Sequence, residues 1–188
     1  MNRQRIQLYV LGLMLVASFL PGCSTSPTAI PIPPTATAVP PTATHAFADS
    51  ADEVAWLLQQ FNPDDPGIDG TAILAYSRRD VSRWIRILAD AGLGSVGLDR
   101  YEGTPMPGVK VGTFARAKGL EFARVFVPGL SDEFPMGNRA MEDNIVEKAS
   151  SLYVAMSRAR DGLMLSYAGA PSMFLEPVRP FCDAVRHG

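Results

Sequence analysis

Short apolar runs alternate with stretches of helical periodicity from residue 50 onward, and this alternation restricts the fold more than any other feature of the chain. Apolar residues recur at the spacing i, i+3, i+4, i+7 from Val54, from Val81 and from Leu152, which predicts three amphipathic helices. Apolar runs that indicate buried strands lie at 71–76, 109–114, 124–127 and 163–167. Strands that alternate with helices predict an α/β fold in three layers with a mostly parallel sheet.

Residues at the expected helix ends support this pattern. Ser50 is followed three residues later by Glu53, which has the form of a capping box with Ser50 as the N-cap. Gly92 and Gly94 are expected to end the second helix. The segment 128–140 contains Pro, Gly, Asp and Asn and is expected to be a loop. Its acidic pair, Asp132 and Glu133, is therefore expected to lie in a solvated turn.

The first 23 residues have the composition of an export signal. Arg3 and Arg5 precede the uncharged run 6–20, which predicts a secretory signal. That run is shorter than the ~20 apolar residues of a membrane-spanning helix. Its end, Leu-Pro-Gly-Cys, resembles a bacterial lipoprotein cleavage box, which implies that Cys23 is lipidated and anchors the protein to a membrane. A plain signal or an N-terminal anchor helix is the alternative, and the protein would be cytoplasmic if this N-terminus is a fusion or start-site artefact.

Residues 24–48 are expected to be a Pro/Thr-rich disordered linker. Six prolines and six threonines lie among residues 24–45, and such a composition leaves little to bury and few backbone donors. His45 lies in this linker and His187 lies next to the C-terminus. A catalytic site built on histidine is therefore not expected.

The expected globular domain, 49–188, carries an acidic balance. It contains all 19 acidic residues and all basic residues except Arg3 and Arg5, so its net charge is −4. A general basic surface for nucleic acid is thereby excluded, and any such contact needs a local arrangement of Arg and Lys. Neither Cys23 nor Cys182 has the spacing of a metal ligand, and no metal site is expected in this chain.

Residues 113–122 form the first polar cluster, with the sequence Thr-Phe-Ala-Arg-Ala-Lys-Gly-Leu-Glu-Phe. Gly119 follows a strand and lets a ligand approach the backbone closely. Glu121 can accept hydrogen bonds from a ribose hydroxyl. A charged surface turn would explain the Lys-Gly-Leu-Glu segment equally well when it is taken alone.

Residues 153–160 form the second cluster, with the sequence Tyr-Val-Ala-Met-Ser-Arg-Ala-Arg. The guanidinium of Arg158 can direct two donors at a phosphate and stabilise the charge that develops in phosphoryl transfer. The periodicity places Arg158 and Arg160 on one helix, about 200° apart, so that Arg160 faces elsewhere. A solvated arginine pair near a helix C-terminus is the simpler alternative.

Together the two clusters resemble two motifs of the C-terminal motor domain of UvrD/Rep-type superfamily 1 DNA helicases. The resemblance covers residues 50–175 and implies a RecA-like fold of the P-loop NTPase type. It implies that Thr113 touches the backbone of single-stranded DNA, that Gly119 and Glu121 approach the nucleotide, and that Arg158 is an arginine finger. It also implies ATP with Mg²⁺ as the cofactor, shared with an upstream domain that carries the P-loop.

The sequence departs from the family pattern at several positions. Ala115 stands where the family commonly has His, Tyr76 falls near a usual Arg, and Ala149 and Ser150 stand where two Arg are common. These 188 residues contain no Gly-x-x-x-x-Gly-Lys-Ser/Thr loop, which is the element that cradles the phosphates.

Two functions follow as hypotheses. The first is a helicase-derived half-domain that binds nucleotide and DNA and does not hydrolyse ATP alone. The second is a membrane-anchored lipoprotein whose helicase-derived domain is inactive and serves in interactions.

Overall fold

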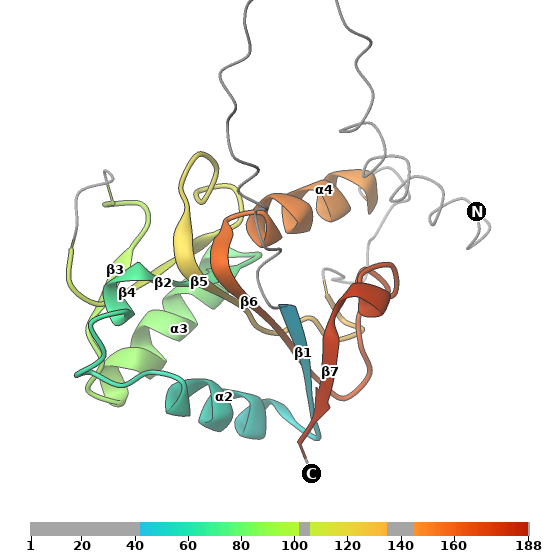
Figure 1. Ribbon diagram of the computed structural model, residues 1–188, viewed down its shortest axis with the longest axis horizontal. Helices are drawn as coiled ribbons and strands as arrows, with labels where there is room; N and C mark the ends of the chain where they lie inside the picture. Colours follow the sequence, from blue (N-terminus) through green and yellow to red (C-terminus); the bar gives the residue numbers. More distant parts are fainter. Residues whose placement is uncertain (1–41, 102–105, 135–144, 188) are drawn as a thin grey trace, which may run out of the picture. The chain divides into compact units, whose positions relative to one another are not determined.

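The described part of the chain is built on one seven-stranded parallel sheet (Figure 1). The computed structural model describes residues 42–101, 106–134 and 145–187. The strand order is β3-β4-β2-β5-β6-β1-β7, and each neighbouring pair runs parallel. The strands are β1 (Thr42–Phe47), β2 (Thr71–Ala75), β3 (Ser95–Gly97), β4 (Val109–Thr113), β5 (Phe122–Val127), β6 (Ala159–Ala168) and β7 (Asp183–Arg186).

Within residues 42–187, as far as the structure describes them, three α-helices cover the sheet and confirm the predicted three-layer α/β fold. Helices α2 (Ser50–Gln59) and α3 (Arg78–Asp90) lie on one face, and α4 (Ile145–Met156) lies on the other (Figure 1). Two short 3₁₀ helices, η2 (Ile68–Gly70) and η4 (Arg179–Phe181), precede β2 and β7.

Each face of the sheet has its own hydrophobic core. Alternate residues of β2 serve the two cores: Leu74 packs with the α4 side, and Ile73 packs with α2 and α3. Leu57 of α2 and Leu88 of α3 are fully buried in the second core. Because β2 is buried along its whole length, it lacks the apolar–polar alternation of a half-exposed strand, as expected for a parallel sheet covered on both sides.

The predicted linker is wrong at its C-terminal end, because residues 42–47 form β1 in the interior of the sheet. Thr44 and Phe47 are each 5% exposed, and β1 pairs with β6 on one side and β7 on the other. Two strand partners satisfy the backbone hydrogen-bonding groups of a segment whose own composition is poor in core residues. The folded domain thus begins before residue 49.

Local details of three other predictions also change. The N-cap of α2 is Asp49, whose Oδ1 accepts from the amides of Ala51 and Asp52, and not Ser50. Helix α4 ends at Met156, before the arginines. The strands β3 and β7 were not expected, since β3 has only three residues and all four residues of β7 are exposed.

Candidate functional site

The structure brings the two polar clusters together at the amino ends of β5 and β6, which we call the amino edge of the sheet. Phe122 begins β5, Ala159 begins β6, and these residues are paired neighbours. The Phe122 amide donates to the Arg158 carbonyl oxygen at 2.9 Å. Arg158 Nη1 donates to the Leu120 carbonyl oxygen at 3.3 Å, across 38 positions of sequence. The turn before β5 and the turn before β6 are therefore one structural unit.

Arg158 is held in place by acceptors from its own neighbourhood. Its Nε donates to the Val154 carbonyl oxygen at 3.0 Å, and its Nη2 donates to Ser157 Oγ at 3.0 Å. With the bond to Leu120, three N–H groups of the guanidinium are used. A guanidinium has five, so two donors remain for a ligand. This arrangement fits a phosphate contact by a side chain that is already oriented.

Gly119 and Glu121 lie beside Arg158 on the surface. Gly119 has φ +83°, a conformation that suits glycine, and a Cβ placed there would meet no atom within 4 Å. The space above its backbone is therefore open to a ligand. Glu121 is exposed and its carboxylate makes no hydrogen bond within the described residues. We call Gly119, Glu121 and Arg158 the amino-edge cluster.

The prediction that Arg160 faces away from this cluster on a helix is wrong. Arg160 lies on β6, and its charge interacts with that of Glu121. Its guanidinium donates to both oxygens of Asp161, with Nη2 to Oδ2 at 2.8 Å. The hydrogen bond and the charge of Asp161 raise the pKa of Arg160, and the Arg160 guanidinium lowers the pKa of Asp161. The helical periodicity predicted a helix that continues through Arg160, whereas α4 ends at Met156 and β6 begins at Ala159.

Thr113 lies at the opposite, carboxyl edge of the sheet. Thr113 is the last residue of β4 and pairs with Ala75, the last residue of β2. Thr71, the first residue of β2, pairs with the third residue of β5, so β5 begins further toward the amino edge than β2 does. At ~3.3 Å per residue, these levels differ by roughly 20 Å. Thr113 Oγ1 accepts from the Arg116 amide at 3.3 Å. The structure thus separates the residue expected to contact DNA from the residues expected to contact nucleotide.

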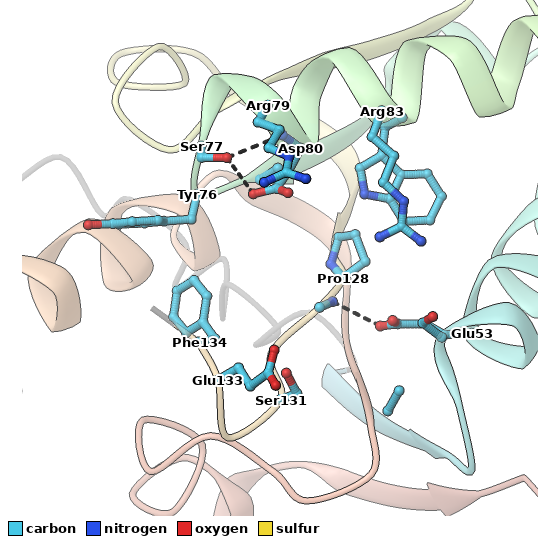
Figure 2. A pocket seen from close by; sticks show the side chains of 15 residues that line it. Glu53, Tyr76, Ser77, Arg79, Asp80, Arg83, Pro128, Ser131, Glu133 and Phe134 are labelled. Atoms are coloured by element: carbon cyan, nitrogen blue, oxygen red, sulfur yellow. Dashed lines mark hydrogen bonds between the residues drawn. The ribbon is translucent and has the colours of Figure 1, made fainter. Parts of the chain in front are cut away.

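A cavity of ≈ 590 Å³ opens at the carboxyl edge (Figure 2). It lies between the first turns of α2 and α3 and the loops that follow β2 and β5, and Arg79, Arg83, Tyr76, Glu53 and Glu133 are among its lining residues. These side chains belong to no site that the sequence predicts. The one available signal was the four-residue spacing of Arg79 and Arg83, which puts both on one face of a helix.

Glu53 has a different role from the predicted capping box. Its side chain is buried, and Oε1 accepts from the Gly129 amide at 2.9 Å and from Ser166 Oγ at 2.6 Å. It therefore ties α2 to the loop after β5 and to β6. Because these partners are 76 and 113 positions away in sequence, no local pattern could show them.

The departures from the family pattern lie at the carboxyl edge of the sheet and on α4. Ala115 is exposed in the turn after β4. Tyr76 is 39% exposed at the end of β2, where its ring packs edge-on against Phe114 and Phe134. Ala149 and Ser150 lie half-buried on α4.

The N-terminal predictions, including Cys23, lie outside the described residues. In the part of the chain that the structure describes, no helix is long and apolar enough to cross a membrane. Within the same residues, no three His, Cys, Asp or Glu side chains converge as a metal site. Asp132 and Glu133 form an exposed turn.

The family model of the UvrD-like helicase C-terminal domain matches residues 68–170. Among solved structures, the chain is similar to the C-terminal domain of a possible DNA helicase from Lactobacillus plantarum WCFS1, with 26% identity, a TM-score of 0.61, and coverage of 76% of this chain and 84% of that chain. It shares its fold with the C-terminal domain of the DEAD-box protein Dbp5, with 12% identity, a TM-score of 0.54, and coverage of 78% and 89%. No curated protein matches.

These similarities confirm the predicted RecA-like fold. The family match contains Thr113, the amino-edge cluster and the cavity residues of α3, but it begins after α2. Since the match spans more than half of the chain, this protein belongs to the UvrD-like helicase C-terminal domain family.

Proposed function

We propose that this chain acts as the second motor domain of a superfamily 1 DNA helicase and completes a nucleotide site on a partner domain that carries the P-loop. The observation that carries the proposal is the amino-edge cluster. Two backbone-anchored hydrogen bonds join the turn that contains Gly119 and Glu121 to Arg158. The two simpler alternatives, a charged surface turn at residues 118–121 and a solvated arginine at the end of a helix, do not require hydrogen bonds between the two segments.

Each residue of the cluster has a distinct task in this proposal. ATP with Mg²⁺, when bound between the two domains, supplies the phosphoryl group whose transfer develops negative charge. Arg158 offers its two remaining N–H donors to that charge, and its bonds to main-chain carbonyls keep it oriented. Glu121 accepts from a ribose hydroxyl, and Gly119 leaves room for the nucleotide. Thr113 contacts single-stranded DNA at the other edge.

The proposal predicts that the full chain alone does not hydrolyse ATP, with or without single-stranded DNA, because it lacks the phosphate loop. Addition of the P-loop half of a UvrD-type helicase should restore DNA-stimulated phosphate release. Arg158→Ala should then lower turnover by ~10³ or more, the range of arginine fingers. Arg158→Lys should not rescue it, since an ammonium lacks the planar fork.

The matched control is Arg179→Ala, on the exposed surface of η4. Arg160 is unsuitable as a control, because its charge interacts with that of Glu121 in the cluster. Equal losses at Arg158 and Arg179 would refute the assignment of Arg158. Robust ATP hydrolysis by the chain alone would refute the half-domain function.

A second function is favoured by a specific observation, the signal-like residues 1–23. In this alternative the mature protein is a membrane-anchored lipoprotein, and its helicase-derived domain, remote from cytoplasmic ATP and DNA, serves only in interactions. Cys23→Ser should then release the protein from the membrane fraction. Mass spectrometry of the mature N-terminus provides the direct check, and retention of Met1 would exclude lipidation.

A further inference from the structure

The edge strand β7 is attached to the rest of the domain by few contacts. All four of its residues are exposed, and it lies at the end of the sheet with β1 as its neighbour (Figure 1). Within the described residues, none of its side chains packs in either hydrophobic core. A segment with so few buried contacts opens at a lower free energy than the core strands do.

A contact between two histidines holds the end of this strand. His187 follows β7 directly, and its amide donates to the Ala46 carbonyl oxygen at 3.0 Å. Its Nε2 lies 3.0 Å from Nδ1 of His45, which is on β1. The ring centroids are 5.3 Å apart, which is the nitrogen separation plus about two ring radii, so the two nitrogens face each other in line. The contact is therefore a hydrogen bond between imidazoles.

Aromatic rings surround the pair on the α2 side of the sheet. The His187 ring stacks on Phe47, with centroids 4.4 Å apart and planes that differ by 9°. The His45 ring lies 4.2 Å from the Trp56 ring of α2. Phe47 is 5% exposed, and His187 supplies part of its cover. Movement of His187 away from β1 would therefore bring Phe47 into contact with water.

The charged groups of α2 and β7, which pack around the pair, are Asp52, Glu53, Asp183 and Arg186. Asp52 and Asp183 are exposed, so solvent and salt screen their charges. Glu53 already accepts from Ser166 Oγ, and alternation along the strand directs Arg186 to the other face of the sheet. Burial lowers the pKa of His45, and the charge of His187 lowers it further.

Protonation decides whether the two rings attract or repel each other. A neutral imidazole has one nitrogen that donates and one that accepts, so in a neutral pair one facing nitrogen donates to the other. One added proton can occupy the outer nitrogen of the donor ring and leave this bond intact. When both rings are protonated, both facing nitrogens carry N–H, and two positive charges meet in a half-buried site. Because His45 lies on a strand that is paired on both sides, His187 is the ring that can move away.

We propose that the His45–His187 pair is a pH-operated latch, which holds β7 against β1 at neutral pH and releases β7 in acid while the rest of the sheet stays folded. The released segment extends back toward Val178, which is buried in the core on the α4 side. Release uncovers Phe47 and leaves β1 as the edge of the sheet. The latch requires no nucleotide, DNA or partner domain, so it stands or falls independently of the proposed function.

Hydrogen exchange of the full chain in mild detergent, measured by mass spectrometry and corrected for the intrinsic effect of pH, tests the latch. It is measured at about pH 7.5 and about pH 5, on either side of the usual histidine pKa. The amides of residues 183–187 should be protected at the higher pH. Below about pH 6.5 their exchange should accelerate by roughly tenfold per pH unit, because opening takes up a proton. The amides of β2 and β5 should keep their protection.

Two variants separate protonation of the pair from other effects of acid. His187→Phe keeps a ring on Phe47 but cannot be protonated, so residues 183–187 should stay protected at both pH values. The matched control is Arg186→Gln, which removes an exposed charge of β7 from the other face and should release the strand in acid as the parent does.

Four results would overturn the latch. Residues 183–187 without protection at neutral pH would show that β7 is not held, and unchanged protection in acid would show that it is not released. An equal loss of protection in β2 would mean that the whole domain unfolds. Release of β7 in the His187→Phe variant, at the pH at which the parent releases it, would show that the histidine pair is not the cause.

Discussion

The contact between Glu53 and Ser166 allows a quantitative test of what holds the carboxyl edge together. Ser166 is 2% exposed, and its hydroxyl donates to Glu53 Oε1 at 2.6 Å. Glu53→Ala leaves that hydroxyl buried without its acceptor, and it also removes the acceptor of the Gly129 amide. Gly129 is exposed, so water can replace its lost partner, whereas Ser166 has no such substitute.

The magnitude follows from these two contacts. A hydrogen bond to a charged group contributes about 1.5–3 kcal/mol, and a stranded buried polar group costs about 1–3 kcal/mol. We therefore expect Glu53→Ala to lower the free energy of unfolding by about 3–4 kcal/mol. For a domain of this size the melting temperature should fall by roughly 6–16 °C. Glu53→Gln keeps an acceptor oxygen and should cost less than half as much.

A double-mutant cycle isolates the pair. Urea denaturation of the parent, Glu53→Ala, Ser166→Ala and the double variant should give a coupling energy of about 1.5–3 kcal/mol. The double variant should be less destabilised than the sum of the single variants, because it leaves no orphaned hydroxyl. A coupling energy below about 0.5 kcal/mol would show that the loss at Glu53 arises elsewhere, and the reasoning would be refuted.

Three further predictions concern stability. Gly119→Ala should lower the free energy of unfolding by only about 1 kcal/mol, because the positive φ is strained for alanine but the space around the new Cβ is open. Gly108→Ala should lower it more, because its Cβ would lie 2.5 Å from a backbone oxygen. Urea denaturation of both variants measures the difference. Leu88→Ala should cost about 2–5 kcal/mol by the same measurement, as a cavity in a fully buried position. Burial and the neighbouring His187 lower the pKa of His45. The neutral form is therefore favoured on folding, and stability should fall as pH drops below about 6.5; His45→Phe should flatten that decline in thermal unfolding curves.

Local sequence patterns were sufficient for the three main helices and for four strands. Each of these segments buries a regular set of apolar residues, so its periodicity is visible without its neighbours. β1 was missed for the opposite reason. Its residues are mostly Thr and Ala, and the strand forms because β6 and β7 satisfy its backbone on both sides. His45, which was assigned to the linker, and His187, next to the C-terminus, consequently meet with ring nitrogens 3.0 Å apart.

The sequence by itself determined the layered α/β architecture, and the order of its two polar clusters indicated the helicase family. Those properties depend on residue types and spacings along the chain. Only the tertiary structure decided which residues share a site: it joined Arg158 to the turn at Gly119 and Glu121, placed Thr113 at the opposite edge, and gathered Glu53, Tyr76, Arg79 and Arg83 around one cavity. Parallel strands align their ends regardless of distance in sequence, so strand order and register, which no local pattern encodes, select the neighbours.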